Sequence, residues 1–136
     1  MAEQIRSIVD PEIILFSINR FEEITSERID LCPQNEFLQV SCKKIPCGTQ
    51  FKPHKHLTLH RATDNTHEAW IVLDGEIEAT FYDIDDSVIR VTILKTGDCA
   101  VVFRAGHSFK VLKDNTILYE VKNGPYYGQE KDKKFI

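Results

Sequence analysis

The stretch AWIVLDGEIEATFY, residues 69–82, decides the fold class. Its first part, residues 69–73, is a short apolar run, and Asp74-Gly75 then supplies a turn signal that is typical of β-hairpins. The second part, residues 77–82, follows this turn at once. The stretch therefore predicts two strands that pair as a hairpin.

Further strands are expected around this pair. Residues 88–94 alternate in part between apolar and polar side chains and end at the turn residues 95–98. Residues 99–103 are continuously apolar, which is typical of a strand buried on both faces. Short strands at this spacing, separated by turn residues, indicate an all-β sandwich or barrel. The remaining predicted strands are 37–42, 109–112 and 116–121.

The N-terminal thirty residues contain the single helix signal. Ser17 could cap a short helix over 17–25, because Ile18, Phe21 and Ile24 would share one face. We expect this segment to pack against the outside of the barrel, or to pair with a neighbouring subunit.

The charge balance narrows the class of protein. Among the 136 residues, 17 basic and 21 acidic side chains give a net charge of −4, which argues against a nucleic-acid partner. Charges throughout the first thirty residues argue against a secretory signal, and the apolar stretch 13–18 is too short to span a membrane. We therefore expect a cytoplasmic protein. The run 131–134 is typical of a solvated tail.

Four cysteines, at positions 32, 42, 47 and 99, form no Cys-x-x-Cys pair, which argues against a thiolate zinc site. Metal-binding chemistry is indicated instead by histidines and a carboxylate. Side chains two apart on a strand share a face, so His54 and His56 are expected to project together. With Glu68 from another strand they form a 2-His-1-carboxylate set, and His107 could be a fourth ligand.

The same residues carry a resemblance to the cupin superfamily over residues 36–122. Gly48, His54, His56, Glu68 and Gly75 match both ends of the first cupin motif. The opening Gly97-Asp98 and the closing His107 match the second motif. The tail 120–135 is similar to the WbuC-like cupins of surface-polysaccharide biosynthesis.

The resemblance implies a double-stranded β-helix, or jelly-roll barrel, over residues 36–136, with residues 1–35 as an extension. It also implies one divalent transition metal ion (Zn, Fe, Mn or Ni) on His54, His56, Glu68 and His107. A homodimer is implied as well.

The sequence departs from the motif between His56 and Glu68, where eleven residues replace the usual three or four. His60 keeps the parity of the histidine pair and could replace Glu68 as a ligand. Within this insert, Arg61 could bind a phosphate or carboxylate, because its planar guanidinium donates in pairs. His60 and Tyr82 are, like Arg61, candidate substrate-binding residues. A catalytic base would be His60, Tyr82 or a group that the sequence does not assign.

Three functions remain open. The resemblance favours a metal-dependent isomerase or epimerase acting on a sugar or nucleotide-sugar, with the metal as Lewis acid. A non-catalytic cupin that binds a small molecule such as a sugar phosphate is the first alternative. An Fe(II)-dependent dioxygenase is the second, and the metal that co-purifies would discriminate between the enzymes.

Overall fold

The computed structural model describes residues 2–136, which form an all-β fold whose strand pairs are antiparallel. Within residues 2–136, helix is confined to a 3-10 turn, η1 (Phe21–Glu23), and a short α1 (Gln129–Asp132). No helix in the described part of the chain has the length and apolar character needed to cross a membrane. The strands are β1 (Glu3–Arg6), β2 (Ile14–Asn19), β3 (Arg28–Asp30), β4 (Ser41–Lys43), β5 (Glu68–Asp74), β6 (Glu76–Tyr82), β7 (Val88–Lys95), β8 (Cys99–Val102), β9 (Gly106–Val111) and β10 (Ile117–Lys122).

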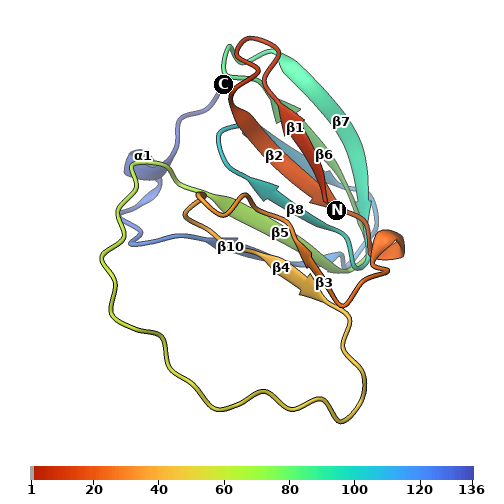
Figure 1. Cartoon of the computed structure of the whole chain (residues 1–136). Helices are drawn as coiled ribbons and strands as arrows, with labels where there is room; N and C mark the ends of the chain where they lie inside the picture. The colour runs from red at the N-terminus through yellow and green to blue at the C-terminus, as the bar shows by residue number, and fades with distance from the viewer. Residues whose placement is uncertain (1) are drawn as a thin grey trace.

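The strands form three sheets. The largest has the order β1-β2-β8-β5-β10, the second has the order β7-β6-β9, and β3 pairs with β4 alone. Figure 1 shows the five-stranded sheet between the β3–β4 pair and the sheet of β6 and β7. Along the free edges of β9 and β10 the sheets do not join, so the described residues do not make a closed barrel.

Two apolar clusters explain this layering. Trp70, Val72, Ala100 and Val102 belong to a core shared with the three-stranded sheet. Their neighbours on the same strands, such as Val101, belong to a second core that includes residues of β3. The side chains of β5 and β8 are thus buried on both faces of the large sheet. This confirms the prediction that the run 99–103 is a strand buried on both faces.

The predicted hairpin between 69–73 and 77–82 is wrong. β5 pairs with β8 and β10, whereas β6 pairs with β7 and β9. Gly75, with φ of +96°, turns the chain from one sheet to the other. The reason is burial: β5 is apolar on both faces and therefore lies inside the larger sheet. The hairpin that does form joins β6 to β7 through residues 83–87.

The predicted helix over 17–25 is also wrong. β2 continues to Asn19 and pairs with β8, and only η1 is helical. Ser17 is fully buried and donates its hydroxyl to the Leu31 carbonyl oxygen (2.6 Å) instead of capping a helix. Because Leu15–Ile18 are all buried, this segment is a strand of the sheet and not a cover on its outside.

A long arm, residues 44–67, connects β4 to β5 without any regular secondary structure. It leaves the sheets as the yellow and yellow-green loop at the bottom of Figure 1. Residues 43–66 are all exposed. The strand expected at His54 and His56 is therefore absent, because no neighbouring strand pairs with the arm.

Candidate functional site

A pocket of about 550 Å³ opens between the two larger sheets. Its walls come from the start of β5, the end of β6, β9, β10 and the end of the chain. The lining residues are Glu68, Trp70, Tyr82, Asp86, Ala105, Gly106, His107, Ser108, Phe109, Glu120, Lys133, Lys134, Phe135 and Ile136.

Glu68 is the buried carboxylate of this pocket. As the first residue of β5, it shares the inward parity of Trp70 and Val72, since side chains two apart lie on one face of a strand. The indole Nε1 of Trp70 donates to Glu68 Oε1 at 2.6 Å. On the neighbouring β10, Lys122 is the register partner of Glu68.

His107 lies on β9 and points toward Glu68, with Nε2 3.5 Å from Glu68 Oε1. Its Nδ1 lies 3.2 Å from the Ala105 carbonyl oxygen. The Nδ1 proton points to that carbonyl, and a proton on Nε2 faces the Glu68 carboxylate in the charged ring. Loss of the Nε2 proton would leave the tautomer that metal-binding histidines commonly adopt.

Each group shifts the other's pKa. Burial disfavours the ionised Glu68, but the contact with His107, the Trp70 N–H and the charge of Lys122 outweigh it and lower the Glu68 pKa. Burial likewise disfavours a charged His107, yet the Glu68 carboxylate and the Ala105 carbonyl raise its pKa, against the opposing charge of Lys133. The two groups therefore form a coupled pair at the pocket wall.

The four expected ligands are divided between two places. Glu68 and His107 meet, whereas His54 and His56 lie on the exposed arm, with ring centroids 5.6 Å apart. His60 and Arg61 are exposed on the same arm, and Tyr82 lines the pocket. Among residues 2–136, no three His, Cys, Asp or Glu side chains gather closely enough to hold a metal ion.

The two donors that do meet fit a metal. Ligand atoms about 2.1 Å from a shared ion at a tetrahedral angle lie about 3.4 Å apart. The separation of 3.5 Å between His107 Nε2 and Glu68 Oε1 is close to this. The pocket thus supplies half of the expected donor set without rearrangement.

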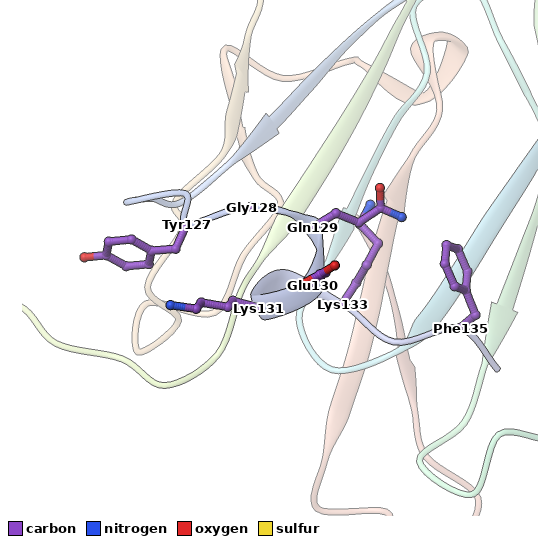
Figure 2. A pocket seen from close by; sticks show the side chains of 7 residues that line it. All are labelled: Tyr127, Gly128, Gln129, Glu130, Lys131, Lys133 and Phe135. Atoms are coloured by element: carbon purple, nitrogen blue, oxygen red, sulfur yellow. The ribbon is translucent and has the colours of Figure 1, made fainter.

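The C-terminal tail is a part of the site that sequence reasoning missed. Lys133 and Lys134 belong to the run expected to be a solvated tail; both are exposed, yet both line the pocket. A second hollow, of about 640 Å³, lies against the same tail and shares Lys133 and Phe135 with the pocket. Figure 2 shows this hollow, with Tyr127 and Lys131 projecting to one side and Phe135 at the opposite end. No spacing signal in the sequence connects the tail to His107.

A second polar cluster lies at the root of the arm. The Leu38 N–H donates to His67 Nδ1 (3.2 Å), so the ring proton is on Nε2, which lies 3.4 Å from Glu36 Oε2. Glu36 Oε1 in turn accepts from Arg104 (2.7 Å). Burial lowers the pKa of His67; Glu36 opposes this shift and Arg104 adds to it. His67 therefore faces away from Glu68 and anchors the arm.

The comparisons with known proteins are negative. No protein-family model matches the chain, and no curated protein or solved structure matches it either. The site's own residues therefore carry the functional argument.

Proposed function

We propose that this chain is a metal-binding cupin whose pocket takes a small molecule, with Glu68, His107, His54 and His56 holding one divalent transition metal. The observation that carries the proposal is the Glu68–His107 pair inside the pocket. A carboxylate and imidazoles suit zinc, iron, manganese and nickel.

Closure of the arm is the step that would complete the ligand set. β9 and β10 each have one unpaired edge, and exposed apolar side chains lie along both strands, including Phe109, Val111, Tyr119 and Val121. Such edges favour the addition of another strand. We infer that the arm adds to them and closes a jelly-roll barrel.

Three features support this inference. A strand added beside β9 would lie next to His107, and in an extended arm His54 and His56 would share one face. Leu57 and Leu59, both exposed, would share the other. Residues 43–66 span roughly 80 Å when extended at about 3.3 Å per residue, so length does not prevent closure.

The reaction class that suits this site is isomerisation or epimerisation of a sugar or nucleotide-sugar. The metal would supply electrostatic stabilisation for a substrate oxygen that gains negative charge. Glu68 and His107 would hold it from the inner wall. Tyr82 lines the same pocket, and its hydroxyl group would be the one to exchange a proton with a bound substrate.

Binding without turnover is a second candidate, and one observation favours it. Glu68 is engaged by His107 and Trp70, and Lys122 lies 3.7 Å from Glu120, so neither of these two pocket carboxylates is an unoccupied base. The third, Asp86, lies on the turn between β6 and β7. The Fe(II)-dependent dioxygenase and the homodimer stay predictions.

Metal analysis of the purified protein tests the proposal. We expect about one equivalent of a transition metal in the wild type, and its loss both in Glu68→Gln with His107→Ala and in His54→Ala with His56→Ala. Lys55→Ala, between the two histidines, is the matched control and should keep the metal. If the Glu68→Gln variant kept its metal and a His60→Gln variant lost it, His60 would be the ligand in place of Glu68.

Metal identity separates the enzyme candidates. Iron together with oxygen uptake would favour the dioxygenase, whereas zinc, manganese or nickel would favour isomerisation or binding. A wild type that takes up none of these ions, even after incubation with them, contradicts the proposal.

A further inference from the structure

The C-terminal tail lies across the pocket that contains Glu68 and His107. Lys133 to Ile136 line this pocket, although they follow β10 by more than ten residues. The tail also approaches the backbone of β9 closely. A Cβ added at Gly106 would be 2.8 Å from Ile136 Cδ1, so Ile136 packs beside the residue that precedes His107.

One ion pair fixes the start of this segment. Lys122 Nζ lies 3.3 Å from Asp132 Oδ2, and both side chains are mostly shielded from solvent. Burial opposes the charge on Lys122, but Asp132 and then Glu120 outweigh it and raise the Lys122 pKa. Since Lys122 is the register partner of Glu68, Asp132 is anchored close to the inner wall.

The charges of the pocket are not equally available to a ligand. His107 is paired with Glu68, and Lys122 is paired with Glu120 and Asp132. Lys133 and Lys134 form no ion pair with any residue between 2 and 136. Lys133 is near enough to His107 for its charge to oppose protonation of the ring.

The acidic groups do not neutralise this end of the pocket. Asp86 lines the pocket from the turn between β6 and β7, which is a different wall from the tail. Two lysines that line the same pocket carry together the charge that balances the double charge of a phosphate, which lysine binds as a point charge. Asp86 would repel a phosphate and so direct it toward the tail.

We propose that Lys133 and Lys134 bind a phosphate group of the pocket's small-molecule ligand, and that the Asp132–Lys122 ion pair holds them in place. This proposal rests on the proposed function in one respect, because it uses the same pocket and names the class of ligand that the pocket takes. It assigns to the tail the selection of a phosphorylated ligand over its uncharged parent.

Titration of the full-length protein with inorganic phosphate tests this, both as purified and after chelation, with binding measured by calorimetry. We expect the wild type to bind phosphate and Lys133→Ala with Lys134→Ala to bind it at least tenfold more weakly. Lys131→Ala, which removes a neighbouring positive charge that does not line the pocket, is the matched control and should bind as the wild type does.

The Asp132–Lys122 ion pair is tested by a separate variant. Asp132→Asn should weaken phosphate binding and increase hydrogen exchange of the tail amides, whereas the metal content of the same sample should stay unchanged. Equal phosphate affinity in the wild type and the double lysine variant, or no phosphate binding by the wild type, overturns the proposal. Absence of metal from every sample would instead contradict the metal site and leave the phosphate result to be judged separately.

Discussion

At the scale of single residues, Asp83 shows how one buried carboxylate joins distant parts of the chain. It accepts hydrogen bonds from the Ile8 N–H and the Ile84 N–H, both at 2.7 Å, and thus ties the N-terminal turn to the turn after β6. Burial opposes its ionisation, but the hydrogen bonds from Ser7, Ile84 and Ile8 outweigh it and lower the pKa of Asp83.

This lowered pKa predicts a pH-dependent contribution to stability. Because the folded-state pKa lies below the unfolded value near 4, the stabilisation is present above about pH 4 and is lost as the pH falls through the folded-state pKa. Asp83→Asn should lower the free energy of unfolding by about 2 kcal/mol at pH 7, the usual size for hydrogen bonds to a charged group.

Urea unfolding at pH 7 and at about pH 3 measures this difference, which should shrink at the lower pH. Asp86→Asn in the same turn removes an equal charge and is the control. An equal loss at both pH values would show that the charge of Asp83 has no part in the effect.

At the same scale, the sequence predicted Glu68 and His107 as neighbours, and the structure brings them together. The donor to Glu68 from Trp70 also agrees with strand parity, since the two residues are two apart. Lys133 could not be predicted in this way, because its approach to His107 depends on the path of a tail with no periodic pattern.

At the scale of elements, Gly75 controls the passage from the larger sheet to the smaller one. Its φ of +96° is one that side chains with a Cβ rarely adopt, and an added Cβ would lie 2.9 Å from the Thr116 Cα. Gly75→Ala therefore combines backbone strain with a steric clash. We expect it to lower the free energy of unfolding by more than about 2 kcal/mol.

Gly48→Ala separates the two contributions. Gly48 also has a positive φ of +82°, but nothing lies within 4 Å of its added Cβ. Gly48→Ala should lower the free energy of unfolding by about 1 kcal/mol at most. Thermal unfolding of both variants measures the difference, and a Gly75→Ala protein as stable as Gly48→Ala would exclude the clash.

Strand positions were more predictable than strand partners, although the predicted strand 37–42 is wrong before Ser41, where β4 begins. The apolar run 99–103 and the alternating run 88–94 correspond to β8 and β7, because burial on two faces or on one leaves a direct pattern in the sequence. The turn at Asp74-Gly75 contains no comparable signal. Its residues do not show whether the strands on its two sides belong to one sheet or to two. The helix over 17–25 failed because pairing with β8 outweighed local helix preference.

At the scale of the whole molecule, the charge of the arm contrasts with that of the rest. Residues 44–67 contain four basic side chains and one acidic side chain, in a chain with 17 basic and 21 acidic residues overall. The remainder thus has 13 basic and 20 acidic side chains, a net charge of −7. This difference attracts the arm toward the sheets and adds to the apolar contacts proposed for closure.

Closure predicts a metal-dependent protease pattern. Without metal, trypsin should cut rapidly after Lys44, Lys55 and Arg61, which are all exposed. With metal bound, cleavage at these three sites should slow by at least tenfold, because an arm paired with β9 and β10 is no longer free to enter the protease. Mass spectrometry of the fragments gives the rates.

The variant His54→Ala with His56→Ala provides the comparison, since added metal should not protect its arm. Protection of this variant equal to that of the wild type would mean that the two histidines do not connect the arm to the pocket. Unchanged cleavage in both proteins would contradict closure itself.

The hydrogen bond between Trp70 and Glu68 has an optical consequence. Trp70 is the single tryptophan of the chain, and its ring meets His107 edge-on with centroids 5.2 Å apart. Tryptophan emission therefore arises beside Glu68 and His107 and from nowhere else in the chain. A change in the partners of Glu68 or His107 should alter the intensity or wavelength of that fluorescence, so the unlabelled protein contains its own spectroscopic probe of the pocket.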